Sequence, residues 1–184
     1  MPLYKKDFKR LIEFPEVEQM IQKTKNPEHK VLIALLYLTG ARPAELLELK
    51  KRNFLIVGSD LRMILPTKKR KKAGAVNDRL LPVDIEETPF VKNLIMPWVE
   101  ALPSQDSDIL SIRTTTRIQQ IVYAASDNKL CPYTFRHNRL SQLAMGGATV
   151  DELKQWKGAV DIASITPYLL MSPIVLDRVK KRIK

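Results

Sequence analysis

The chain has 184 residues, of which 45% are apolar, and this favours one large domain or two small ones with a real hydrophobic core. Its formal charge is +11 and its pI is near 9.8, so its surface attracts polyanions, and nucleic acid is the first partner to expect. A single cysteine, Cys131, excludes an internal disulfide, and with only two histidines it also excludes a zinc site built on cysteine. No apolar run approaches the roughly 20 residues that span a bilayer. No apolar signal region follows the N-terminal basic residues, so the sequence predicts an intracellular protein with no membrane partner.

Prolines and capping residues mark the helices expected in the first fifty residues. After a basic lead-in over residues 1–13, Pro15 begins a helix at a position where proline's missing donor costs nothing. The next helix, 28–38, follows an Asn-Pro start signal and is apolar nearly all round, which predicts a central place in the core. Gly40 ends it, and a further helix is expected over 43–49. The first part of the chain should therefore be helical.

The pattern changes to that of a small sheet after residue 53. The apolar runs 54–57 and 61–65 are separated by Gly-Ser-Asp, which predicts two strands joined by a tight turn. A lysine-rich loop, 67–77, leads to a third short strand at 79–83. Three antiparallel strands are therefore expected beside a helical body.

Helical patterns return in the second half of the chain. The expected helices span 89–102, 114–125, 132–145, 149–156 and 172–184. The first of them should be broken or bent at Pro97. Because no repeat, low-complexity tract or linker is found, we expect one domain over residues 1–184, mainly α with a small three-stranded antiparallel sheet, an α+β fold.

Arg42 is the first residue whose position suggests chemistry, because it lies between the end of a buried helix and the start of the next. A guanidinium presents its donors in a fixed fork that suits a phosphate, and its charge does not titrate away. The alternative is an ordinary helix-terminus arginine that pairs with Glu45 or Glu48. Taken alone, Arg42 favours this alternative, since most surface charges are only solvated.

A dense run of basic residues occupies the loop between the second and third strands. A run of like charges is often only a solvated loop, but this one stands at a hairpin tip that can reach a nucleic-acid backbone. A lysine there can protonate a leaving oxygen once its pKa falls. The run consists of Lys68, Lys69, Arg70, Lys71 and Lys72.

A second group of cations precedes a late tyrosine. Arg136, His137 and Arg139 place three potentially cationic groups within about one helical turn. His137 by itself is more often a hydrogen-bonded core residue than a catalyst. Tyr168 by itself is an ordinary buried aromatic residue. Beside arginines that hold a phosphodiester, however, its oxyanion is favoured and becomes a nucleophile for phosphorus.

Four segments resemble, in the same order, the motifs of the tyrosine recombinases, also called the phage integrase family. T-G-A-R-P-A-E-L resembles the box T-G-x-R-x-x-E-L, whose arginine binds the scissile phosphate. The strands with Lys68 after I-L-P-T resemble that family's hairpin with a catalytic lysine. Y-T-F-R-H resembles H-x-L-R-H, and G-A-V-D-I-A-S-I-T-P-Y resembles the G-H-x-x-x-x-x-T-x-x-Y segment that delivers the nucleophile. The resemblance covers nearly the whole chain.

The resemblance implies a DNA recombinase or integrase domain that cleaves and rejoins strands through a 3′-phosphotyrosyl bond, without metal or nucleotide cofactor. It assigns Arg42 and Arg136 to the phosphate clamp, Lys68 to general acid catalysis and Tyr168 to nucleophilic attack. Tyr133 takes the place of the first histidine of the H-x-L-R-H box. The remaining basic residues are expected to contact DNA: Lys69, Arg70, Lys71, Lys72, His137 and Arg139.

The chain also departs from the family's pattern. Tyr133 can donate a hydrogen bond but is a poor base at neutral pH. Ala159 stands where the family has a histidine or tryptophan, and Trp156 lies about one turn earlier. Another lysine of the basic run can take the place of Lys68. The alternatives left open are a weakened or inactive DNA-binding protein of the same fold and DNA relaxation like that of a type IB topoisomerase.

The expected partner is double-stranded DNA, on which the protein assembles as a dimer or tetramer, whereas without DNA it is monomeric or weakly associated. By the resemblance, the helix 172–184 is expected to exchange between protomers, because its narrow apolar stripe needs a partner surface. The chain begins where the family's catalytic domain begins, so the N-terminal DNA-clamping domain is expected to be absent. The expected location is the cytoplasm or nucleoid, or the host cell for a viral protein.

Overall fold

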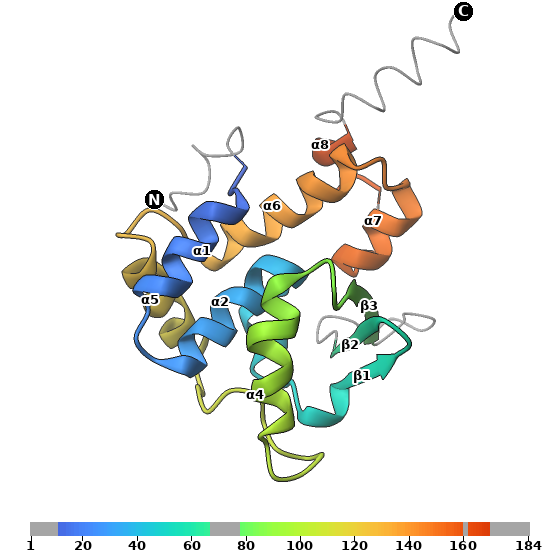
Figure 1. Ribbon diagram of the computed structural model, residues 1–184. Helices are drawn as coiled ribbons and strands as arrows, with labels where there is room; N and C mark the ends of the chain where they lie inside the picture. Colours follow the sequence, from blue (N-terminus) through green and yellow to red (C-terminus); the bar gives the residue numbers. More distant parts are fainter. Residues whose placement is uncertain (1–10, 67–77, 160–161, 170–184) are drawn as a thin grey trace, which may run out of the picture.

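The computed structural model describes residues 11–66, 78–159 and 162–169, which form a helical body with a small sheet on one side (Figure 1). The helical elements are α1 (Phe14–Lys23), α2 (Pro27–Thr39), α3 (Pro43–Leu46), η2 (Lys51–Asn53), η3 (Val91–Ile95), α4 (Met96–Glu100), α5 (Thr115–Ala125), α6 (Pro132–Met145), α7 (Val150–Lys157) and α8 (Thr166–Leu169). The expected mainly α fold with a three-stranded sheet is confirmed. The basic run 68–72 and the expected helix 172–184 lie outside the described residues.

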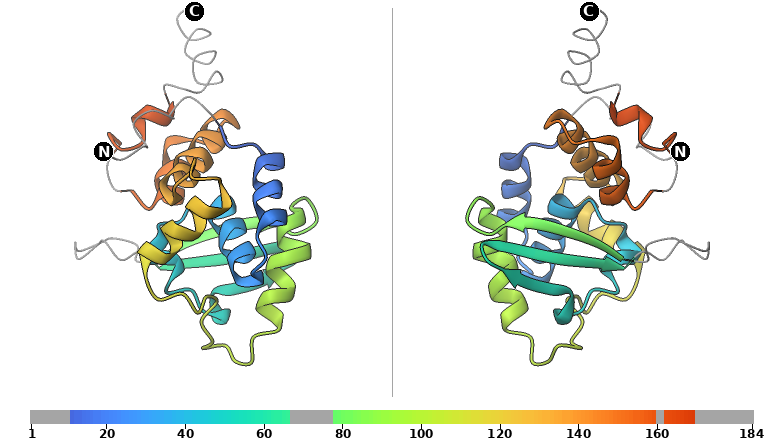
Figure 2. Two further views of the ribbon diagram at one scale, coloured as in Figure 1. Left: turned by 90° about the vertical axis from the view of Figure 1, so that its left-hand side faces the viewer. Right: turned by 90° about the vertical axis from the view of Figure 1, so that its right-hand side faces the viewer.

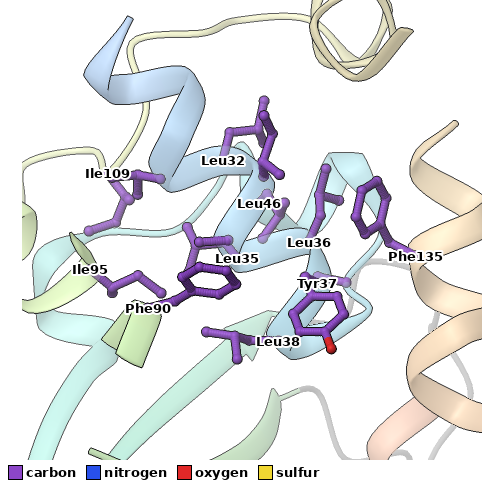
Figure 3. Close-up of a cluster of buried hydrophobic side chains, with 14 of the residues drawn as sticks. Leu32, Leu35, Leu36, Tyr37, Leu38, Leu46, Phe90, Ile95, Ile109 and Phe135 are labelled. Carbon is purple, nitrogen blue, oxygen red and sulfur yellow. The ribbon is translucent and has the colours of Figure 1, made fainter. Parts of the chain in front are cut away.

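Helix α2 is the centre of the main core, as its all-round apolar sequence predicts. The Asn26 side chain caps it by accepting from the backbone N–H of Glu28 at 2.8 Å. Every residue of α2 from Val31 to Thr39 is buried. Helices α1, α5 and α6 pack around it, and Figure 3 shows Phe135 of α6 close to the side chains of α2.

The sheet has the order β1-β2-β3 and is antiparallel throughout (Figure 2), which confirms the predicted strands. Its strands are β1 (Phe54–Val57), β2 (Asp60–Pro66) and β3 (Asp78–Asp84). Side chains of β2 and β3 alternate between buried and more exposed positions, as expected of strands that pack one face on a core. The strand β3 also contacts α7, so the sheet and the C-terminal helices meet.

Helix α3 is shorter than the predicted helix 43–49, which is a correction. The chain leaves the helix after Leu46 because its backbone bonds instead to a distant segment. The N–H of Ile109 donates to Leu49 O at 2.9 Å, and the N–H of Lys51 donates to Ser107 O at 3.0 Å. These tertiary bonds override the helical pattern of the leucines.

The predicted helix 89–102 is irregular, but its irregular part is the turn before Pro97 rather than Pro97 itself. Residues of η3 form a π-helical turn, which closes when the N–H of Met96 donates to Val91 O. Proline has no N–H, and its ring crowds the carbonyl four residues earlier, so a wider turn is accommodated upstream. None of the helices in the described ranges is both long enough and apolar enough to cross a membrane.

A second, smaller core lies between α6, α7 and α8. It is made of Leu140, Ala144, Leu153, Ile165 and Tyr168, all buried. Helix α7 begins with a capping box in which Thr149 and Glu152 bond each other's backbone N–H groups. This second core carries the predicted nucleophile, and the main core carries the arginine box.

Candidate functional site

The end of α2 and the middle of α6 are in close contact. The two predicted clamp arginines, Arg42 and Arg136, therefore lie on neighbouring segments. Gly40 ends α2 in the left-handed conformation, with φ of 57°. A Cβ at Gly40 would lie 3.3 Å from Arg136 Cα and 3.1 Å from Arg139 Cβ. Glycine is therefore required both for the turn and for the approach of α6, and Arg42 follows two residues later as the N-cap of α3.

Arg42 is held by the carboxylate of Glu45. Its Nη1 donates to Glu45 Oε1 at 2.6 Å, and its backbone N–H donates to Glu45 Oε2 at 2.8 Å. The pairing that the sequence leaves open as an alternative is thus present. It is compatible with phosphate binding, because the Arg42 side chain keeps 24% of its surface exposed while that of Glu45 keeps 2%.

Arg136 is buried and anchored by two backbone carbonyls. Its Nη1 donates to Gly40 O at 2.8 Å, and its Nη2 donates to Lys157 O at 2.5 Å. Burial, then the charges of Arg42 and Arg79, lower the pKa of Arg136 to about 10. The guanidinium therefore stays protonated at neutral pH and has a fixed direction.

A third arginine, Arg79 on the inner face of β3, completes this cluster and was not predicted. It donates to the carboxylate of Glu45 and to the carbonyl oxygen of Trp156. Burial lowers its pKa, and Glu45 opposes that effect. A signal was present in the sequence, because Arg79 shares the phase of the apolar residues Leu81 and Val83 along the strand.

Tyr168 is buried and hydrogen-bonded to His137. The distance between Tyr168 Oη and His137 Nδ1 is 2.5 Å, and the two rings are stacked with centroids 5.8 Å apart. Lys157 Nζ lies 5.4 Å from the centre of the Tyr168 ring. His137, expected to contact DNA, thus lies against the predicted nucleophile.

Both partners of this pair have displaced pKa values. Burial raises the pKa of Tyr168 to about 12, although Arg136 opposes the shift. Burial, then the charges of Lys157 and Arg136, lower the pKa of His137 to about 4. At neutral pH the pair therefore consists of a neutral phenol and a neutral imidazole.

The remaining predicted residues lie at the edge of the cluster or outside it. Tyr133 is in the first turn of α6, where 51% of its surface is exposed. The Arg139 guanidinium lies over the ring of Trp156, 5.1 Å from its centroid, beside a pocket of about 640 Å³ between β3, α6 and α7. Lys68 and the rest of the basic run are outside the described residues.

Trp156 and Ala159 serve packing in this structure. The Trp156 indole N–H donates to Thr39 O at 2.9 Å, which ties α7 to the end of α2. Ala159 packs against the second core, and its backbone N–H donates to Lys154 O at 2.8 Å. Trp156 thus holds α7 against the end of α2, next to the segment that contains Arg42. It is not at the position matched by the family pattern.

The cluster has more positive than negative charge. Arg42, Arg79 and Arg136 surround the carboxylate of Glu45, which leaves a net charge of +2 over these four groups. Such a site favours a bound anion with several acceptor oxygens, as a phosphodiester has. Within the described ranges, no group of three or more His, Cys, Asp or Glu side chains is arranged to hold a metal ion.

The model of the phage integrase family matches residues 2–172. Among solved structures, the catalytic domain of bacteriophage HP1 integrase is similar at 18% identity and a TM-score of 0.64, with 93% of each chain covered. XerA recombinase is similar at 15% identity and a TM-score of 0.65, over 95% of this chain and 63% of that one.

XerH site-specific recombinase, bound to its difH substrate, is similar at 15% identity and a TM-score of 0.67, over 95% of this chain and 54% of that one. This chain therefore spans between about half and two thirds of the two Xer proteins. At these identities the likeness shows a shared fold. No curated protein sequence matches the chain.

Proposed function

Since this chain belongs to the phage integrase family, we propose that it is the catalytic domain of a site-specific tyrosine recombinase that cleaves and rejoins double-stranded DNA. The observation that carries the proposal is the anchoring of Arg42 and Arg136 in one buried network next to the His137–Tyr168 pair. Phosphoryl transfer depends mainly on positioning and on charge stabilisation, and such a network supplies both.

In the proposed reaction the Tyr168 oxygen attacks the scissile phosphorus and forms a 3′-phosphotyrosyl bond. The bond from phosphorus to the 5′ oxygen breaks, and Lys68 donates a proton to that oxygen, so that a 5′-hydroxyl leaves. Arg42 and Arg136 stabilise the negative charge that gathers on the phosphoryl oxygens. The reverse step on another DNA end rejoins the strands without metal or nucleotide.

The Tyr168 phenol must lose its proton during this reaction, and His137 is placed to assist. A phenol with a pKa raised to about 12 is essentially un-ionised at neutral pH. The neutral imidazole accepts the hydrogen bond of the phenol at Nδ1, fixes the direction of the oxygen, and takes the proton as the bond from oxygen to phosphorus forms. We assign His137 to positioning Tyr168 and accepting its proton, and Tyr133 to a hydrogen bond with the bound phosphate.

Further parts of the proposal concern DNA contact and assembly. Lys69, Arg70, Lys71, Lys72 and Arg139 are proposed to contact the DNA backbone. The protein is proposed to act as a dimer or tetramer on DNA, with residues 172–184 exchanged between protomers. Removing the residues after Met171 and finding assembly on DNA unchanged would refute the exchange.

The test is covalent trapping on a nicked DNA substrate that prevents religation. We expect the wild-type protein to form an adduct stable to detergent and Tyr168→Phe to form none. Tyr123→Phe, a substitution on α5, is the matched control and should react like the wild type. Arg42→Lys should lose more activity than His137→Gln, and equal losses would argue against the clamp.

A second candidate is a DNA-binding protein of the same fold that does not cleave. Three observations favour it: Tyr133 stands where the family has histidine, Ala159 stands where the family has histidine or tryptophan, and Tyr168 is buried. It predicts DNA affinity that falls steeply with salt and no adduct at any protein concentration. Plasmid relaxation without recombination would instead indicate topoisomerase-like activity.

A further inference from the structure

The geometry points to Arg79 as a positioning residue of the phosphate clamp. We infer that it holds Glu45 so that the carboxylate aims Arg42, and that it also fixes the end of α7, where Arg136 is anchored. This inference rests on the proposed function, because it concerns the arginines assigned there to the scissile phosphate.

The first argument is the cost of placing a guanidinium at this position. The Arg79 side chain is 3% exposed and points to the core side of the sheet, opposite Leu65 in the register of β2 and β3. A buried charge is expensive unless it is paired, and an apolar residue there would avoid the cost. Its Nε is buried without an acceptor within the described ranges. Packing alone therefore does not account for an arginine here.

The second argument is the way Glu45 is shared. Oε1 accepts from Arg42 Nη1, whereas Oε2 accepts from both the Arg42 backbone N–H and Arg79 Nη2. Three donors leave the carboxylate one orientation. Arg79 lies on the buried side of Glu45, where its side chain is 3% exposed, and Arg42 lies on the solvent side, where its side chain is 24% exposed. Only Arg42 of this pair is open enough to meet a substrate.

The third argument is the C-terminal end of α7. Its successive carbonyls Trp156 O and Lys157 O accept from Arg79 and Arg136 respectively. Carbonyls at a helix C-terminus lack partners within the helix and carry partial negative charge, so they favour cations. Gly158 follows with φ of 61°, and a Cβ there would lie 2.7 Å from Arg79 Cδ. The glycine thus leaves room for the Arg79 stem.

Together these contacts make Arg79 the link between the two halves of the clamp. On one side it reaches Arg42 through Glu45, and on the other it shares the end of α7 with Arg136. It is the second residue of β3, so the strand that follows the basic run is tied to the same network. Replacing it should misalign Arg42 without removing any group that touches DNA.

The experiment compares Arg79→Met with Arg62→Met, which removes the same charge from the opposite face of the sheet. In single-turnover cleavage, Arg79→Met should slow adduct formation by on the order of a hundredfold, the effect of misplacing a reacting group. Its DNA affinity and salt dependence should change no more than those of Arg62→Met. In an Arg42→Ala background the Arg79→Met penalty should become smaller, because only the part that acts through the end of α7 and Arg136 is left to lose.

Two results would overturn the inference: an equal penalty in the Arg42→Ala background, or a loss confined to DNA affinity. If Arg79→Met does not fold, Arg79→Lys replaces it, since lysine keeps the charge but its single ammonium cannot bridge Glu45 and Trp156 as the fork does. Intermediate cleavage supports the inference, and wild-type cleavage contradicts it.

If the wild-type protein forms no adduct, the proposed function fails, and the inference is decided without DNA. Nitrogen-15 spectra of the arginine side chains report whether Arg42 is held. Averaging of the Arg42 signals in Arg79→Met supports the link to Arg79, whereas unchanged signals contradict it.

Discussion

The burial of His137 against Tyr168, near the charges of Lys157 and Arg136, predicts a specific loss of stability in acid. The folded protein lowers the pKa of His137 from 6.5 to about 4, so the folded state resists protonation that the unfolded chain accepts. The contribution of this neutral histidine to the free energy of unfolding is fully present above pH 6.5 and is lost as the pH falls towards 4. At 1.36 kcal/mol per pKa unit the shift corresponds to about 3 kcal/mol, and because His137 is only partly buried, screening by solvent reduces the expected loss to about 1 to 2 kcal/mol.

The assay is urea denaturation of the wild-type protein and of His137→Gln at half-unit steps between pH 4 and 7.5. The variant is expected to be less stable at pH 7 and to lose about 1 to 2 kcal/mol less than the wild type on acidification. His29 also has a pKa lowered by burial, so His29→Gln controls for the other histidine. Parallel stability curves for the wild type and His137→Gln would refute the reasoning.

Three further predictions test the network and its surroundings. Gly158→Ala and Gly58→Ala both place alanine in the left-handed conformation, which lowers the free energy of unfolding by about 1 kcal/mol. Only Gly158→Ala also brings a Cβ within 2.7 Å of Arg79 Cδ. Chemical denaturation should therefore show a further loss of about 1 to 3 kcal/mol for Gly158→Ala. Equal losses of free energy of unfolding for the two alanine variants would show that the Arg79 side chain moves away from the new Cβ without penalty. Glu45→Gln removes the carboxylate between two guanidinium groups and should lower the free energy of unfolding by about 3 kcal/mol at pH 7. An unchanged free energy of unfolding would indicate that the two guanidinium groups are solvated rather than buried. Burial raises the pKa of Tyr168 to about 12. Between pH 10 and 12 the free energy of unfolding of the wild type should therefore fall by about 2 to 3 kcal/mol more than that of Tyr168→Phe. Identical stability curves for the two proteins in this range would contradict the burial of the phenol.

The parts of the fold that the sequence predicted well are those with local causes. Prolines and caps such as Asn26 act within one turn, and the alternation in β2 and β3 is a property of the strand itself. The end of α3 could not be predicted in this way, because it is decided by tertiary bonds, in which Ile109 N–H donates to Leu49 O and Lys51 N–H donates to Ser107 O. The π turn before Pro97 depends on how its neighbours accommodate the proline.

The candidate site shows the same division. Arg42 and Arg136 stand in motifs with a recognisable order, so the sequence selects them as candidates. Arg79 was missed because an arginine in a short strand usually faces solvent, and its partner Glu45 is 34 residues away. The contact of His137 with Tyr168 spans 31 residues and joins two helices, which no local pattern predicts.

The bonds that anchor the proposed clamp join residues that are among the most distant hydrogen-bonded pairs in the described part of the chain. Arg136 reaches Gly40 across 96 residues, Arg79 reaches Trp156 across 77, and the indole of Trp156 reaches Thr39 across 117. Closing such loops costs chain entropy, and each of these bonds needs both of its distant segments to be present. A growing chain on the ribosome therefore has no assembled clamp until α7 has emerged. The same dependence means that a single proteolytic cut between α3 and α7 divides the clamp between two fragments.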